Sequence, residues 1–113
     1  MIPQNLETER AILGLLMTGH DPYEVIEKLT VMDFYPTSHQ IIYNSMRDLF
    51  RKGVNIDIIT LTDNLKTQNK LEAVGISYLT LLTSSVPVSY NMPDYINILK
   101  QTSYKRQVYL LTL

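Results

Sequence analysis

The chain contains no cysteine, only two histidines, and four glycines that stand apart from one another. Without cysteine it can form no disulfide and no thiolate zinc site, and it has no thiol nucleophile. The single glycines do not build the G-x-x-x-x-G-K-S/T loop that cradles nucleotide phosphates. His20 and His39 lack the short spacing of a helical zinc site. We therefore expect no catalytic, cofactor-binding or metal-binding residue in this chain.

The chain also lacks an excess of basic residues and any long apolar run. Ten lysines and arginines against eleven acidic residues give a formal net charge of −1. Domains that grip the phosphates of nucleic acids usually carry a basic excess, so direct binding of DNA or RNA is not expected. No stretch approaches the roughly 20 apolar residues that a membrane span requires, and the first residues do not form a signal peptide. These features favour a cytoplasmic protein without membrane contact.

The clearest predicted helix lies within residues 33–53. Apolar side chains recur in it at helical spacing, at Ile42, Met46, Leu49 and Phe50. We expect Thr37 or Ser38 to cap its start and Gly53 to close its end, with the two aromatic residues of D-F-Y-P folded back as a plug. The V-N-I-D segment at 54–57 is predicted to be a tether whose valine and isoleucine turn inward.

Helical spacing predicts further segments along the rest of the chain. They span 6–18, a short helix that begins at 21–24, 58–67, a single turn at 71–75, 77–84 and 91–113. Capping side chains precede three of them, at Asn5, Asp57 and Asn91, and D-P-Y-E at 21–24 has the form of a capping box. A chain of 113 residues with 45% hydrophobic content suffices for one core. The prediction is a single all-α domain over 1–113, a compact bundle of about six helices.

Several side chains invite a chemical interpretation but have simpler ones. His39 could sense pH or bind a ligand, yet a packed or capping imidazole is favoured at the start of a helix behind two aromatic rings. Asp57 and Asp63 lie on different faces of one helix and do not form a catalytic carboxylate pair. The eight tyrosines are dispersed along the chain, which favours packing in the core and at interfaces over a base-stacking platform.

Six motifs follow one another in order along nearly the whole chain. They are P-Q-N-L-E-T-E-R-A-I-L-G at 3–14, L-T-V-M-D-F-Y at 29–35, H-Q-I-I-Y at 39–43, I-D-I-I-T-L at 56–61, L-E-A-V-G at 71–75 and V-P at 86–87. Together they resemble the N-terminal domain of DnaB-type replicative DNA helicases. The chain departs from that family around Gly75, where two glycines are usual, and at 89–93, where A-A-N-I is usual. These departures favour a divergent member, such as one carried by a phage or plasmid.

The resemblance implies that the parent protein is a ring-shaped hexamer that unwinds DNA with ATP in the 5′ to 3′ direction. A motor domain that binds ATP and Mg²⁺ would follow residue 113, and single-stranded DNA would be held by the whole ring. The present chain would be the N-terminal collar, assembled as a trimer of dimers, which steadies the ring and receives primase and the helicase loader. Its last helix would lead into a helical hairpin.

The last helix ends on the apolar run V-Y-L-L-T-L without a capping residue, and we expect the chain to continue in a longer protein. Such a run suits an interface, where aromatic and aliphatic anchors are enriched. The predicted interface residues are Tyr104, Lys105, Arg106, Tyr109, Leu110 and Leu113, with Lys105 and Arg106 at the rim. Packing of Leu110 on the domain's own core is a comparable alternative.

Two other functions remain open at this stage. The chain could be a free-standing helical protein that binds a host helicase or primase and modulates replication. It could also be a helix-turn-helix DNA-binding domain, with Gln40, Asn44, Arg47 and Arg51 exposed on one helix. A motor domain in the same reading frame would favour the collar, and steeply salt-dependent duplex binding would favour the DNA-binding domain.

Overall fold

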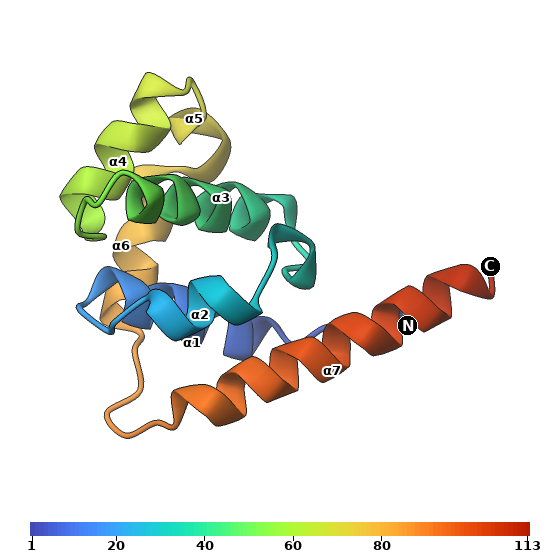
Figure 1. Ribbon diagram of the computed structural model, residues 1–113. Helices are drawn as coiled ribbons and strands as arrows, with labels where there is room; N and C mark the ends of the chain where they lie inside the picture. Colours follow the sequence, from blue (N-terminus) through green and yellow to red (C-terminus); the bar gives the residue numbers. More distant parts are fainter.

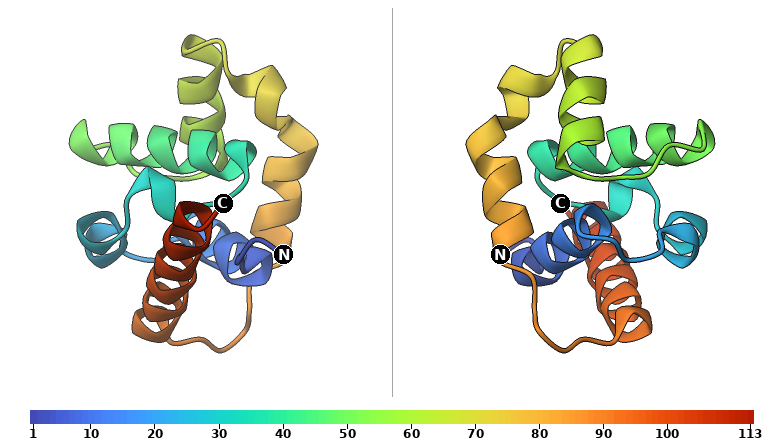
Figure 2. Two further views of the ribbon diagram at one scale, coloured as in Figure 1. Left: turned by 90° about the vertical axis from the view of Figure 1, so that its right-hand side faces the viewer. Right: turned by 90° about the vertical axis from the view of Figure 1, so that its left-hand side faces the viewer.

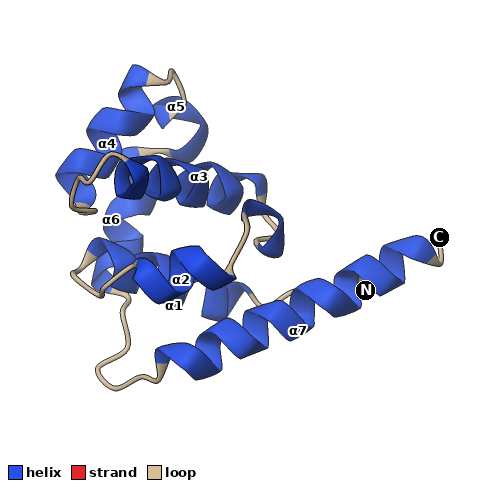
Figure 3. Ribbon diagram, in the orientation of Figure 1, coloured by secondary structure: helices blue, strands red, loops and turns tan.

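The computed structural model describes residues 1–113, which fold into seven α-helices and one short 3₁₀-helix without strands. The elements are α1 (Leu6–Met17), α2 (Tyr23–Lys28), η1 (Val31–Asp33), α3 (Thr37–Arg51), α4 (Ile58–Thr67), α5 (Leu71–Val74), α6 (Ile76–Ser84) and α7 (Met92–Leu111). Figures 1 and 3 show the arrangement. The predicted all-α class is confirmed, and the turn expected at 71–75 is α5.

Helices α1 and α3 form the centre of the molecule. Helix α1 packs against α3, α6 and α7, and α3 packs against η1, α4 and α5. Figure 2 shows the segment between α6 and α7 looping past α1 before α7 begins. Helix α7 runs along one side of the molecule, and its last turns project beyond the other helices (Figure 1). We call residues 1–91 the head. None of the helices is both long enough and apolar enough to span a membrane.

The apolar stripe predicted for α3 is confirmed in the core, where the rings of Phe34 and Tyr43 are also buried. Ile42, Met46 and Leu49 are buried, whereas Phe50 is half-buried. Phe34 is fully buried with its ring centroid 4.6 Å from that of Tyr43. The Tyr43 hydroxyl can be buried because it donates to two backbone carbonyls of the α2 region, at 2.9 and 3.1 Å.

Three of the predicted helix caps are confirmed. Asn5 accepts a hydrogen bond from the Thr8 amide at 3.0 Å, and Asn91 accepts one from the Asp94 amide at 3.1 Å. Asp57 accepts from two amides of the first turn of α4, both at 2.9 Å. Each cap satisfies backbone donors that the helix itself leaves free, so these helices begin close to where the sequence places them.

Four local predictions are wrong. Helix α3 has no side-chain cap, because the extended backbone ends at Pro36 and both Thr37 and Ser38 are already helical. The capping box at 21–24 does not form, since Pro22 instead of Asp21 holds the cap position of α2, although the Asp21 carboxylate accepts from the Tyr23 amide at 3.0 Å. In the tether, Ile56 is buried as expected but Val54 is exposed. Of the aromatic plug only Phe34 is buried, while Tyr35 stays half-exposed.

Candidate functional site

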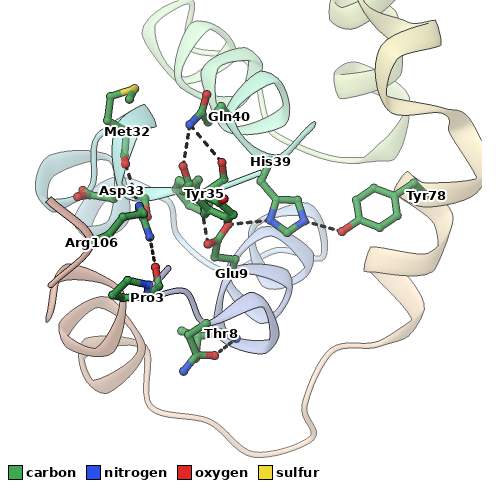
Figure 4. Close-up of polar contacts among 12 residues, drawn as sticks. Pro3, Thr8, Glu9, Met32, Asp33, Tyr35, His39, Gln40, Tyr78 and Arg106 are labelled. Atoms are coloured by element: carbon green, nitrogen blue, oxygen red, sulfur yellow. Dashed lines mark hydrogen bonds and ion pairs between the residues drawn. The ribbon is translucent and has the colours of Figure 1, made fainter. Parts of the chain in front are cut away.

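The buried polar centre of the domain is the carboxylate of Glu9 on α1. Glu9 is 0% exposed, and its two oxygens accept from the backbone amide of Tyr35 at 3.1 and 3.2 Å. One of these oxygens also lies 2.8 Å from Nδ1 of His39 (Figure 4). A buried carboxylate is tolerated only where such donors replace water. This residue of the first motif therefore joins α1 to the start of α3.

His39 extends this contact to a third helix. It is almost fully buried, with Nδ1 toward Glu9 and Nε2 hydrogen-bonded to the hydroxyl of Tyr78 on α6. A carboxylate cannot donate, so Nδ1 carries the proton, and in the neutral imidazole Nε2 accepts from Tyr78. Burial raises the pKa of Tyr78, as does the charge of Glu9, against the opposing charge of Arg10. The packed-imidazole interpretation of His39 is confirmed.

A second polar cluster joins η1 to α7. The Asp33 carboxylate accepts from the Thr30 amide at 2.8 Å and from Lys100 Nζ at 3.1 Å. Burial alone would raise the pKa of Asp33. The Thr30 amide, the nearby Ser103 hydroxyl and the Lys100 ammonium together hold that pKa below its usual value. Asp33 therefore stays ionised and ties the turn before α3 to the last helix.

Arg106 is part of the same region, and its predicted place at an exposed rim is wrong. Its side chain is buried, with the residue only 5% exposed. Nη1 donates to the Pro3 carbonyl at 3.1 Å, and Nη2 donates to the carbonyls of Met32 at 3.2 Å and Asp33 at 3.0 Å (Figure 4). The guanidinium also lies 5.3 Å from the centre of the Tyr35 ring, within cation–π range.

The sequence contained a signal for this burial that the prediction did not use. Ile96, Leu99, Ser103 and Arg106 recur at steps of three and four residues, so they share one face of α7. All four are buried in the structure. Arg106 lies on the same face of the helix as the core residues before it, and it does not belong with the exposed residues after it.

The other predicted interface residues are exposed or half-buried on α7. Tyr104, Lys105, Leu110 and Leu113 are exposed, and Tyr109 is half-buried. Leu110 is 48% exposed, which excludes the alternative that it packs in the domain's own core. Whether these residues form an interface stays a prediction.

The structure adds Val108 and Leu111 to this group, and Leu111 is 87% exposed. At 100° per residue, the apolar side chains at 108, 109, 110, 111 and 113 surround the helix axis. A helix that is apolar on every side is normally buried. We call residues 104–113 the distal segment of α7, and it is the candidate partner-binding surface.

Two hollows on the surface are not lined by Glu9, His39, Asp33 or Arg106. The first, of about 740 Å³, lies between the end of α1 and the tether. It is lined by Leu16, Met17, Thr18, Gly19, His20, Asp21, Pro22, Phe50, Gly53, Val54, Asn55, Ile56 and Asp57. The second, of about 420 Å³, is lined by Glu7, Thr8, Arg10, Ala11, Ser85, Pro87 and Tyr95. His20 at the edge of the first is hydrogen-bonded to the Tyr90 hydroxyl at 2.8 Å.

Comparison with known proteins agrees with the motifs. Residues 1–101 match the family described as the DnaB-like helicase N terminal domain. The replicative DNA helicase DnaB of Buchnera aphidicola subsp. Baizongia pistaciae is 38% identical over 109 residues, which are 95% of this chain and 24% of that protein. The replicative DNA helicase DnaC of Bacillus subtilis is 38% identical over 108 residues, 94% of this chain and 24% of that protein.

The fold is also similar to a solved structure. The crystal structure of the N-terminal domain of DnaB helicase from Mycobacterium tuberculosis superposes with a TM-score of 0.90 at 31% sequence identity. The match covers 96% of this chain and 80% of that one. The chain spans about a quarter of the length of the curated relatives that it matches.

Proposed function

Because the chain belongs to the family of DnaB-like helicase N-terminal domains, we propose that it is the collar of a hexameric replicative DNA helicase and acts through protein contacts. The chemistry would reside in a separate motor domain that binds ATP and Mg²⁺ and moves 5′ to 3′ on single-stranded DNA. The collar would hold the ring together and receive primase and the helicase loader in the cytoplasm.

The observation that carries this proposal is the distal segment of α7. Its apolar side chains surround the helix axis, and all but the half-buried Tyr109 are exposed, Leu111 to 87% and Leu113 to 83%. Exposed apolar surface of this kind marks a protein–protein contact. We propose that it begins a helical hairpin that packs against a second subunit, with Tyr104, Tyr109 and Leu110 among the anchors and Lys105 at the rim.

The rest of the domain suits the role of a rigid support. Glu9, His39 and Tyr78 join three helices through buried hydrogen bonds, and none of them lines either surface hollow. A fully satisfied buried network gives a domain one well-defined conformation. An assembly module needs this property, because its contact surfaces must keep fixed relative positions.

The helix-turn-helix alternative loses support in the structure. Of the four polar residues that it needs on α3, Gln40 is engaged, because its amide donates to the Phe34 carbonyl at 2.8 Å. The formal net charge of −1 also provides no overall basic excess for binding phosphates.

The first experiment is to read the gene beyond the codon for Leu113. The collar proposal expects an open frame that continues into a G-x-x-x-x-G-K-S/T loop. A stop codon close to that point would overturn it, and a free-standing protein that binds a helicase or primase would then become the working hypothesis.

The second experiment measures assembly of the full-length product by light scattering after size exclusion. We expect a hexamer, and we expect Leu111→Asp combined with Leu113→Asp to dissociate it, because two charges cannot be buried in an apolar contact. The control is Ile59→Asp on α4, an apolar position outside α7 that is also largely exposed, at 76%. If the control dissociates the ring as strongly as the α7 variant, the distal segment is not the assembly surface.

A further inference from the structure

Helix α7 is held to the head in two different ways along its length. Its first half is held by buried apolar side chains, Met92, Ile96 and Leu99. Beyond Leu99 no apolar side chain of the helix is buried, and the last buried residue is Arg106. The far end of the docked helix is therefore held by polar contacts.

Arg106 makes these contacts with two segments that are distant in the sequence. One nitrogen of the guanidinium donates to the Pro3 carbonyl, ahead of α1, and the other donates to the Met32 and Asp33 carbonyls in η1. Only the planar fork of arginine can reach acceptors on both sides at once. The ion pair of Lys100 with Asp33 also joins α7 to η1, but it lies directly after Leu99 and so does little to fix the far end of the helix.

We propose that Arg106 is a latch that fixes the direction in which α7 leaves the head, and that the latch can open without unfolding the head. The apolar contacts up to Leu99 then act as a pivot. This inference concerns the head itself and holds whatever the parent protein does. It makes Arg106 a positioning residue, because it acts on the distal segment through the orientation of the helix.

The geometry makes the effect measurable. Val108 lies about 13 Å beyond Leu99 along the helix axis, at about 1.5 Å per residue. A pivot of about 20° around Leu99 would therefore move Val108 by roughly 5 Å. Displacements of this size would separate or misalign any partner surface that the distal segment carries.

The absence of cysteine allows spin labels to be placed cleanly. We would label Val108→Cys on α7 and Ile59→Cys on α4, both exposed, and measure the distance distribution by pulsed electron resonance. Arg106→Met removes the donors and keeps an unbranched apolar side chain. Lys105→Met is the matched control, because it removes the same charge from an exposed neighbouring position.

We expect a narrow distribution in the parent chain and in Lys105→Met. Arg106→Met should broaden it by about twofold, since the end of the helix then samples displacements of several ångströms. Arg106→Lys keeps the charge but loses the fork, so its distribution should lie between the two. Hydrogen exchange in α3 should remain slow in all variants.

Two outcomes would overturn the proposal. If Arg106→Met leaves the distribution as narrow as in the parent chain, the apolar contacts alone set the direction of α7. If both Arg106 variants lose protection in α3 as well, the arginine belongs to the cooperative core and is not a latch.

Discussion

Replacement of Glu9 offers a direct test of the buried network, because two substitutions at this position should have very different costs. In Glu9→Ala, the Tyr35 amide and Nδ1–H of His39 both lose their acceptor in a buried site. Each buried donor left unpaired costs about 1–3 kcal/mol. The total loss is then about 4 kcal/mol, a large share of the roughly 5–15 kcal/mol that stabilises a domain.

Glu9→Gln should cost only about 1 kcal/mol, because the network can rearrange. The amide oxygen can accept from the Tyr35 N–H while the amide nitrogen donates to Nδ1 of His39. His39 must then carry its proton on Nε2 and donate to the Tyr78 oxygen. The Tyr78 hydroxyl can turn its own hydrogen toward solvent, because this residue is half-exposed. Every buried group keeps a partner, at the cost of a change of tautomer.

Urea unfolding tests the predicted difference in stability, and nitrogen NMR of the His39 imidazole tests the predicted change of tautomer. The first measures the difference between the Ala and Gln variants, and the second distinguishes a proton on Nδ1 from one on Nε2. Glu7→Gln, on the same helix but exposed, serves as control and should change stability by about 0.5 kcal/mol or less. If Glu9→Gln is as unstable as Glu9→Ala, or if the tautomer does not change, this account of the network is wrong.

Three further predictions concern single contacts. Gly14→Ala should destabilise by about 1–2 kcal/mol in urea unfolding, because its Cβ would lie 2.4 Å from the Leu82 carbonyl oxygen and overpacking outweighs the gain in helix propensity. The folded state holds the pKa of Asp33 below its usual value, so ionised Asp33 stabilises the fold above the usual pKa, and this stability is lost as pH falls through the lowered one. Stability measured against pH in acid should therefore fall less steeply for Asp33→Asn than for the parent chain, whereas the control Asp63→Asn should keep the full slope. Asp57→Ala should lose about 1 kcal/mol from the α4 cap in thermal unfolding, whereas Asp57→Asn should lose almost nothing, and equal losses would contradict a capping role.

The sequence was most informative where structure depends on nearby residues. The bounds of α4, the three side-chain caps and the stripe of α3 follow from contacts within one helix turn, so local patterns were sufficient to predict them. The predicted cap of α3 failed although Thr37 and Ser38 are good capping residues. There the preceding proline holds the extended cap position, so that both Thr37 and Ser38 already belong to the first turn of the helix.

Arg106 could not be placed from sequence for a related reason. Its partners are backbone carbonyls, which every residue carries, and they lie between 73 and 103 residues away in the sequence. No residue type marks such acceptors in advance. The only sign that Arg106 faces the core was its helical spacing from Ile96, Leu99 and Ser103. Its positive charge, close to an apolar run, favoured an exposed position instead.

The motifs that carry the family resemblance are mostly explained by the interior of the domain. Asn5 caps α1, Glu9 and His39 form the buried network, and Phe34 fills the core. Residues of this kind specify a fold and leave the choice of partner open. The surface that we propose for partners, residues 104–113, lies outside all six motifs and beyond the family match at 101. Exchange of residues 107–113 between relatives, which leaves Arg106 and its contacts with the head in place, should therefore alter which subunits assemble while leaving the stability of the head unchanged. A chimera that assembles with the same partners as its head donor would show that recognition lies elsewhere.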